Sequence, residues 1–327
     1  MRYIMLTGHR KSGTTLLHKL FDGHPEINVY PNDISLLYAF FPCWANSDIS
    51  LNEKKQRITR VLKKSTSSAS GLAVSERVNS FDPEYFVKIF WKHCEDNCLS
   101  KPSGLIKALS FAYCDYAKLD TSLPFLFKET SQAVNFQGMM DDGLDVECIQ
   151  IIRDPRDNYA AIKEGVTDYY KKMGEGERES LASLLNRASL DLHLAKDLMS
   201  SKEFNYSTLR FEDLVENPDN EMKELAKRVG ISWAESLLFP TFLHRDYFGN
   251  NHGGEKLVGI SAKNAGKWVE RISKVEAAII EGWMEKVMLD WGYQLTHTKE
   301  DQRRALQDFY AWYNCRYFYR DSFQASE

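Results

Sequence analysis

The chain has little that would direct it to a membrane or to nucleic acid. No run in its 327 residues approaches the roughly 20 apolar residues that span a bilayer. The first apolar run, residues 3–7, is also too short for the hydrophobic region of a signal peptide. The formal net charge is only −4, so no general basic field favours nucleic acid. We therefore expect a cytoplasmic protein with no membrane span and no nucleic-acid partner, whose anion sites are local.

The sequence also lacks a disulfide framework. Its six cysteines are scattered along the chain, which is typical of free thiols in a reducing compartment. Cys94 and Cys98 lie four residues apart beside His93, but no second ligand pair accompanies them, so we predict no metal site. A hydrophobic content of 43% and a charged content of 27% are typical of a soluble globular protein.

Strand-like and helix-like segments alternate along most of the chain. Short apolar segments at 3–7, 27–31, 124–129, 146–153 and 204–211 are each followed by helical patterns. This alternation predicts an α/β fold with a parallel, doubly wound sheet and helices on both of its faces. We expect one domain over residues 1–327, with a helical insertion at about 50–120 and an aromatic helical tail at about 300–327. The tail either packs on the domain or on a dimer partner, or it forms a wall of the acceptor pocket.

A glycine-rich turn, "LTGHRKSGTTLL", follows the first strand segment. Gly8 and Gly13 have the spacing of a nucleotide triphosphatase P-loop, but Thr14 stands where that motif needs lysine, and Lys11 precedes the second glycine. Such a turn still directs backbone N–H groups and a helix N-terminus at an anion, and the hydroxyls of Thr14 and Thr15 add donors. We expect it to bind one phosphate with a transferable group, and Lys11 to replace a metal at the bridging oxygen.

A second candidate anion site is the segment "RDPRD" at 153–157. Asp154 is a helix cap, Pro155 suits the first helical position, and Asp157 stands three residues after the cap. Arg153 ends the preceding strand, at the carboxyl edge where open α/β sheets bind ligands. It is either a bidentate phosphate ligand or part of a structural salt bridge.

Four segments together resemble the sulfotransferases that use 3′-phosphoadenosine 5′-phosphosulfate (PAPS). They are "KSGTT" (11–15), "RDPRD" (153–157), "LRFEDLVENP" (209–218) and "NAGKW" (264–268), in the order and context of that family, and the pattern is closest to its carbohydrate and tyrosyl-protein members. The resemblance implies that Arg153 binds the 3′-phosphate of the donor. It also implies that the 5′-phosphosulfate is held by the loop residues Lys11, Ser12, Gly13, Thr14 and Thr15.

The resemblance departs from the family pattern at one donor position. Where the family places a serine, eight residues after Arg153, this chain has Ala161. Either Arg153 acts with other donors, such as Lys267, or donor affinity is weakened. The resemblance further implies an adenine contact near Phe211, and it places Lys267 in a loop that closes over the donor.

The catalytic candidates lie after the second and third strand segments. Lys128 in "LFKETS" resembles the lysine of a "KTP" segment in many family members, although a plain surface lysine is the alternative. The base that takes the acceptor proton is Asp33, unless Asp33 only caps a helix that starts at 32 or 33. Glu129 is the second candidate, His9 and His24 are less favoured, and His24 is better explained as a packing residue at a helix end.

These observations predict a sulfotransferase that moves the sulfuryl group of PAPS to a hydroxyl of a carbohydrate or small-molecule acceptor, without a metal. Two other functions remain open. One is a small-molecule kinase with a degenerate P-loop, which would need a magnesium-supported triphosphate. The other is a non-catalytic nucleotide-binding protein, suggested by Ala161 and by the loose match of "KETS".

Overall fold

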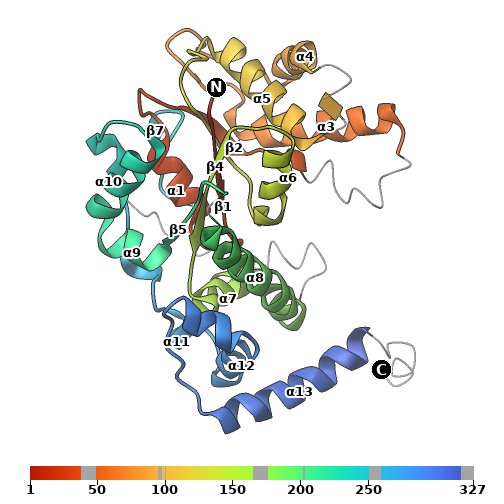
Figure 1. The fold of residues 1–327 in the computed structure, drawn as a ribbon, viewed down its shortest axis with the longest axis vertical. Helices are drawn as coiled ribbons and strands as arrows, with labels where there is room; N and C mark the ends of the chain where they lie inside the picture. The colour runs from red at the N-terminus through yellow and green to blue at the C-terminus, as the bar shows by residue number, and fades with distance from the viewer. Residues whose placement is uncertain are drawn as a thin grey trace. The chain divides into compact units, whose positions relative to one another are not determined.

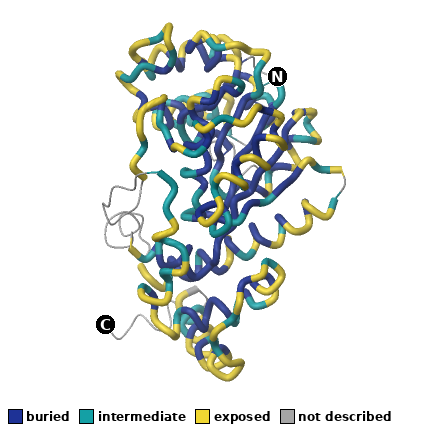
Figure 2. The backbone as a smooth tube through the Cα atoms, turned by 90° about the vertical axis from the view of Figure 1, so that its left-hand side faces the viewer, coloured by how far each residue is buried: buried dark blue, intermediate teal, exposed yellow. Residues whose placement is uncertain are grey.

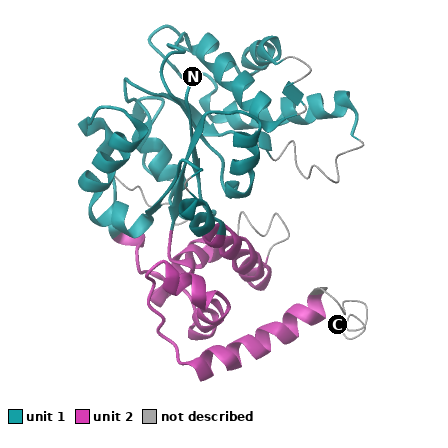
Figure 3. Ribbon diagram, viewed as in Figure 1, with its two compact units in different colours: residues 1–152, 194–249, 256–262 teal, residues 153–193, 250–255, 263–327 magenta. Residues whose placement is uncertain are grey.

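The computed structural model describes residues 1–37, 49–94, 98–99, 101–164, 176–201, 203–249 and 259–317. The chain divides into two compact units (Figure 3). Unit 1 comprises residues 1–152, 194–249 and 256–262, and unit 2 comprises residues 153–193, 250–255 and 263–327. Within the described ranges, no helix combines the length and the apolar character needed to cross a membrane.

Unit 1 is built on a five-stranded sheet in the order β2-β3-β1-β4-β5 (Figure 1). Every neighbouring pair in this sheet is parallel. In the register, Met5 pairs with Phe127 on one side and with Cys148 on the other. The strands are β1 (Tyr3–Thr7), β2 (Asn28–Asp33), β3 (Phe125–Lys128), β4 (Val146–Ile152) and β5 (Tyr206–Arg210). The parallel α/β sheet expected from the sequence is therefore confirmed.

The central strands are covered on both faces. Every residue of β1, β3 and β4 is buried, and the strands form the dark core of unit 1 in Figure 2. Strands of this kind need helices on both sides of the sheet. Helix α1 (Thr14–Phe21) lies on one face, and α5 (Pro102–Ala117) and α6 (Phe136–Asp141) lie on the other (Figure 1). The doubly wound arrangement is thus also confirmed.

The winding direction of the sheet reverses at β1. The chain leaves β1 toward β2 on one side of it, and later leaves β3 toward β4 on the other side. In open α/β sheets, ligands bind outside the carboxyl ends of the strands where the winding direction reverses in this way. The loop that follows β1 begins at this point.

Three described helices between β2 and β3 lie in the segment predicted as a helical insertion. Asp82 caps the second of them, because its carboxylate accepts the Glu84 amide at 2.9 Å and a proline follows at the first helical position. The helices are α3 (Leu51–Thr66), α4 (Pro83–His93) and α5. The remaining elements of unit 1 are α9 (Phe211–Glu216), α10 (Pro218–Val229) and the antiparallel hairpin of β6 (Thr241–Phe242) and β7 (Arg245–Asp246).

Unit 2 is helical in its described part. Helix α12 starts with a capping box between Ser273 and Glu276, and the Phe309 ring of α13 packs edge-on against Trp283 at 6.0 Å. The helices are α7 (Pro155–Glu164), α8 (Glu177–Ser200, which continues into unit 1), α11 (Trp268–Arg271), α12 (Lys274–Asp290) and α13 (Lys299–Tyr317). The aromatic tail is therefore helical as far as residue 317, and residues 318–327 lie outside the described part. Short 3-10 turns are η1 (Ser67–Ala69), η3 (Ala133–Asn135), η5 (Glu235–Leu238) and η6 (Ala262–Asn264).

Candidate active site

Two glycines determine the path of the loop after β1. A Cβ at Gly8 would lie 2.3 Å from the carbonyl oxygen of Ile151, and one at Gly13 would lie 2.5 Å from a ring carbon of Phe211. Both glycines also have positive φ angles, so no other residue fits at either position. Lys11 adopts φ 67°, a left-handed conformation that costs a non-glycine residue about 1 kcal/mol. The surrounding structure therefore holds the loop, and Lys11 in it, in one defined conformation.

The loop leads directly into the N-terminus of α1. Gly13 is the N-cap, so it has no side chain to accept a first-turn amide, and the first turn contains no acidic residue. These amides carry the positive end of the helix dipole. The amide of Ser12 closes the turn by donating to the carbonyl of His9 at 3.1 Å. A strand, a tight glycine turn and an uncapped helix start together form a phosphate-binding geometry.

Phe211 contributes to the shape of this loop. It is the first residue of α9, it is buried, and its ring edge lies against the Cα of Gly13. The side chain thus supports the turn that the phosphate would occupy. The adenine contact expected for Phe211 stays a prediction.

Backbone hydrogen bonds join the end of β3 to the same loop. The amide of Ser131 donates to the carbonyl of Gly8 at 2.9 Å, and the hydroxyl of Thr7 donates to the carbonyl of Glu129 at 2.8 Å. The amide of Gln132 in turn donates to the Thr7 hydroxyl at 3.2 Å. The segment that contains Lys128 and Glu129 is therefore fixed beside the phosphate-binding loop.

Asp33 is the last residue of β2, and its side chain pairs with this segment. One carboxylate oxygen accepts Lys128 Nζ at 2.5 Å and the Thr130 hydroxyl at 2.6 Å. The expectation that Asp33 begins a helix is wrong, because β2 continues through Asp33 in register with Lys128. The rest of that predicted helix, from residue 38, lies outside the described residues. The Asp33 side chain is 29% exposed, and its second oxygen, Oδ1, is buried with no hydrogen-bond partner among the described residues.

Glu129 has a different environment from Asp33, although the two interact. It is 0% exposed, and its two carboxyl oxygens accept the amides of Ser35 and Leu37 at 2.7 and 3.0 Å. Burial and the nearby Asp33 carboxylate raise the pKa of Glu129 well above its usual value. Burial also works against the charge of Asp33, but the Lys128 ammonium and hydrogen bonds to neighbouring side chains lower the pKa of Asp33 to about 2. The two carboxyl groups therefore differ, because their surroundings favour the charged form of Asp33 and disfavour the charged form of Glu129.

The two histidines considered as bases have different positions. His9 is a buried residue of the loop itself. His24 follows α1, where its ring bonds the carbonyl of Ser232 at 2.9 Å and accepts the amide of Glu26 at 3.2 Å. The packing interpretation of His24 agrees with these bonds.

Two buried residues of α1 that sequence reasoning missed hold the irregular part of β2. His18 Nε2 lies 2.7 Å from the carbonyl of Tyr30, and Lys19 Nζ donates to the carbonyl of Pro31 at 2.5 Å. Lys19 also lies 4.1 Å from the centre of the Phe242 ring. Burial is the main reason that the pKa of Lys19 falls to about 7. The only signal in the sequence was a pair of polar residues in a helix whose inner face is otherwise apolar.

Arg156, in the segment 153–157 of unit 2, has a structural role. The Arg156 guanidinium bonds both carboxylate oxygens of Asp154, donates to Glu281 at 2.6 Å and lies 4.1 Å over the Trp268 ring. The amide of Arg156 also donates to Asp154, which caps α7 as the sequence predicts. Arg156 therefore connects α7 to α11 and α12.

Arg153 and Asp157 together hold the segment 264–268. Arg153 Nη2 donates to the carbonyl of Asn264, and the Asp157 carboxylate accepts the amides of Gly266 and Trp268 at 2.6 and 2.8 Å. Arg153 Nη2 lies 4.0 Å from Asp157, so a structural ion pair is present at this position. A phosphate ligand on Arg153 would bind to a side chain that already positions this loop.

Two further sites expected to affect donor binding also lie in unit 2. Lys267 has a side chain that is 39% exposed, and its ammonium lies 3.3 Å from Glu270. Ala161 is a half-buried residue of α7 with no polar side chain to offer. The expected donor contact of Lys267 stays a prediction.

The fold and the loop define a class of protein. A parallel α/β sheet with a glycine turn and an uncapped helix after its central strand is the frame of P-loop-like proteins that transfer groups from phosphate-containing donors. Lys11 lies inside the turn, before the second glycine, and Thr14 stands where magnesium-dependent loops have their lysine.

The chain belongs to the sulfotransferase family, whose model matches residues 4–235. Two solved structures have a similar fold at 16% identity: the sulfotransferase domain from the Synechococcus PCC 7002 olefin synthase and the sulfotransferase domain from the curacin biosynthetic pathway. The first match covers 90% of this chain and 95% of that one with a TM-score of 0.54. The second covers 90% and 99% with a TM-score of 0.56. No curated protein matches the chain in sequence. The family that the motifs resemble is thus confirmed.

Proposed function

We propose that this sulfotransferase moves the sulfuryl group of PAPS to a hydroxyl of a carbohydrate or small-molecule acceptor. One observation carries the proposal: the loop that contains Lys11 is hydrogen-bonded to the segment that pairs Lys128 with Asp33. A cation for the leaving group and a base for the acceptor therefore belong to one framework in unit 1. The carbohydrate or tyrosyl-protein subtype and a cytoplasmic location are part of this proposal and rest on the sequence.

The donor loop fits the reactive end of PAPS. In the reaction, the bond from sulfur to the bridging oxygen of the 5′-phosphate breaks while a bond from sulfur to the acceptor oxygen forms. Lys11 neutralises the charge that develops on the bridging oxygen. The α1 N-terminus, with Thr14 and Thr15, holds the phosphate in line with the acceptor. The product that leaves is 3′,5′-bisphosphoadenosine.

Asp33 is the base that we favour over Glu129. Its carboxylate is ionised and its side chain is partly exposed, whereas Glu129 is fully enclosed and burial disfavours its charged form. A weak base is sufficient, because the acceptor hydroxyl becomes strongly acidic only as its bond to sulfur forms. Lys128 orients the Asp33 carboxylate, and Glu129 positions residues 35–37.

The remaining donor contacts are proposed from the family resemblance. Arg153 would bind the 3′-phosphate, which a guanidinium can hold in a bidentate manner. Because Arg153 also bonds Asn264, this contact would connect the donor to the 264–268 segment and to Lys267. Phe211 would meet the adenine, and Ala161 predicts weaker binding of the 3′-phosphate than a serine would give.

The test is a thermal-shift titration with 3′,5′-bisphosphoadenosine, compared with ATP plus magnesium. We expect bisphosphoadenosine to stabilise the wild type by about 3 kcal/mol at a concentration 100-fold above its Kd. The Lys11→Ala variant should show a smaller shift, and Lys88→Ala, which removes an exposed lysine of α4, should behave like the wild type.

Each alternative function gives a different result. Stabilisation by ATP with magnesium, and none by bisphosphoadenosine, would indicate a kinase. Binding of bisphosphoadenosine, without transfer of the sulfuryl group of PAPS to any acceptor tested, would indicate a non-catalytic binding protein. Either result contradicts the proposed activity.

A further inference from the structure

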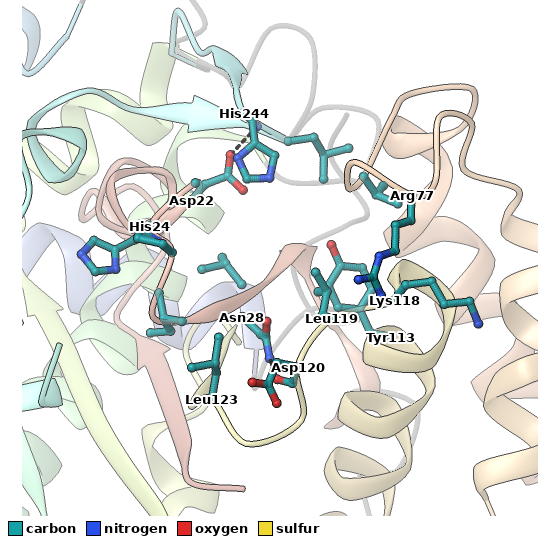
Figure 4. A pocket seen from close by; sticks show the side chains of 16 residues that line it. Asp22, His24, Asn28, Arg77, Tyr113, Lys118, Leu119, Asp120, Leu123 and His244 are labelled. Carbon is teal, nitrogen blue, oxygen red and sulfur yellow. Dashed lines mark hydrogen bonds between the residues drawn. The ribbon is translucent and has the colours of Figure 1, made fainter. Parts of the chain in front are cut away.

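A cavity in unit 1 lies at the start of β2, at the opposite end of this strand from Asp33. It has a volume of 590 Å³, and its lining includes Asp22 at the end of α1, Asn28 at the start of β2 and Tyr113 of α5 (Figure 4). Strand β2 runs from Asn28 at this edge to Asp33 at the catalytic edge. Five steps along a strand span about 16 Å, so the cavity is separate from the donor loop.

A buried hydroxyl points into this cavity. Tyr113 is 2% exposed, and Figure 4 shows its hydroxyl directed at the open space. Among the described residues this hydroxyl has no hydrogen-bond partner, although Tyr113 packs edge-on against Tyr30 at 5.3 Å. The hydroxyl can therefore donate to, or accept from, a ligand in the cavity.

A carboxylate lines the same cavity. Burial is the main reason that the pKa of Tyr113 lies well above its usual value, and the charge of Asp22 adds to this shift. One Asp22 oxygen accepts the Thr241 hydroxyl at 2.7 Å and the His244 amide at 2.9 Å, and the other is turned toward the cavity in Figure 4. Asp22 and Tyr113 thus present an acceptor and a hydroxyl to the same space.

The rest of the lining combines charged and apolar groups, among them Lys118 and Asp120. Arg77 reaches the cavity from the opposite side to Asp22 in Figure 4, and within the described part of the chain its guanidinium forms no ion pair or hydrogen bond. Apolar side chains of Ile27, Leu119 and Leu123 line the space as well. Negative charge at one end and positive charge at the other, with apolar groups between, complement a molecule of the reverse arrangement.

We propose that this cavity binds one small zwitterion per chain, an ammonium and a carboxylate joined by an apolar body. The ammonium pairs with the Asp22 carboxylate, and the Tyr113 hydroxyl hydrogen-bonds the ligand. The carboxylate pairs with Arg77, and the apolar body covers Ile27 and Leu123. This site is independent of sulfuryl transfer and stands even if the proposed function fails.

The test uses three probes of matched length: 6-aminohexanoate, hexylamine and hexanoate, each titrated calorimetrically into the full chain. We expect 6-aminohexanoate to bind with a stoichiometry of one and at least about tenfold more tightly than either monofunctional probe. Tyr113→Phe keeps the ring packing and should weaken binding about threefold to tenfold. Asp22→Asn should abolish binding, and Arg77→Ala should make 6-aminohexanoate and hexylamine bind equally.

Two controls separate binding from folding. Arg303→Ala removes an exposed arginine of α13 and should bind 6-aminohexanoate like the wild type. Each variant should keep the thermal shift that 3′,5′-bisphosphoadenosine gives the wild type, or, if none is seen, the wild-type melting temperature. The proposal is overturned if 6-aminohexanoate does not bind the wild type, binds no better than hexylamine, or binds a folded Tyr113→Phe variant with unchanged affinity.

Discussion

At the scale of single residues, the candidate site divides two carboxyl groups into two states. Asp33 and Glu129 are neighbours, but Lys128 stabilises the charge of Asp33, whereas burial disfavours the charge of Glu129. The sequence identified both residues as candidate bases and could not rank them. Their ranking as bases depends on which carboxyl group is enclosed. Glu129 is enclosed by the segment 35–37, where the amides of Ser35 and Leu37 donate to its carboxyl oxygens.

The ionised state of Asp33 gives a pH prediction. Because its pKa is about 2, the carboxylate stays deprotonated over the whole range in which the fold is expected to be stable. We expect kcat/KM for sulfuryl transfer to be level between pH 5 and pH 7. A decrease with a midpoint near 6.5 would instead identify a histidine, such as His9, as the base.

Substitution of the two carboxyl residues should separate their roles in single-turnover sulfation. Asp33→Asn removes the base and the partner of Lys128, so we expect the rate to fall by about 10² or more. Glu129→Gln removes an enclosed carboxyl group whose charged form burial already disfavours, and it should keep the rate within about threefold. Gln has one accepting oxygen for two amides, so this variant should be less stable by about 1–3 kcal/mol in urea denaturation. Equal rate losses in both variants would contradict the assignment.

At the scale of elements, the sequence located the donor loop well because glycine spacing and strand-to-helix context are local. It did not predict that β2 extends through Asp33. The strand is irregular between Val29 and Asp33, and side chains from α1 satisfy its carbonyls at Tyr30 and Pro31. Such a pairing between segments far apart in the chain leaves no periodic signal.

The loop should be much less tolerant of added atoms than a helix elsewhere in unit 1. Gly8→Ala places a Cβ 2.3 Å from a backbone oxygen at φ 147°, so we expect a loss of several kcal/mol of unfolding free energy. Gly138 is a matched control within α6, because a Cβ there meets nothing within 4 Å. Gly138→Ala should gain about 0.5–1 kcal/mol. Chemical denaturation checks both, and equal effects would show that the loop is not constrained as described.

At the scale of the whole molecule, alternation of strand and helix patterns was enough to predict the doubly wound sheet. The edge cavity was not predictable, because Asp22, Arg77 and Tyr113 come from three separate segments with no motif. The two-stranded hairpin that bonds Asp22 was missed for the same reason, since each of its strands has only two residues.

The pH dependence of global stability should reflect Glu147, a buried residue of β4. It is 2% exposed, and neither carboxyl oxygen has a hydrogen-bond partner among the described residues. Burial raises its pKa above 4.5, against the opposing charges of Arg2 and Arg228. A raised pKa favours the fold below pH 4.5, and this contribution is lost as the pH rises through the folded-state value.

We therefore expect Glu147→Gln to be more stable than the wild type at pH 8, with the difference disappearing near pH 4. Urea denaturation at both pH values measures it. Glu224→Gln, an exposed position on α10, serves as the control and should show no such dependence. An equal effect of Glu147→Gln at both pH values would mean that the carboxyl group does not titrate differently in the folded and unfolded chain.

The lowered pKa of Lys19, near the end of α1, should couple nucleotide binding to proton uptake from the buffer. Lys19 has a pKa of about 7, and it lies about 7.5 Å along the helix from Thr14, at the other end of α1. Negative phosphates bound at that end would raise this pKa, so the protein would take up part of a proton from the buffer. At pH 7, the calorimetric heat of 3′,5′-bisphosphoadenosine binding should then differ between phosphate and Tris buffers. Lys19→Met should remove the difference, and the amount of proton uptake would report how strongly the two ends of one short helix are coupled.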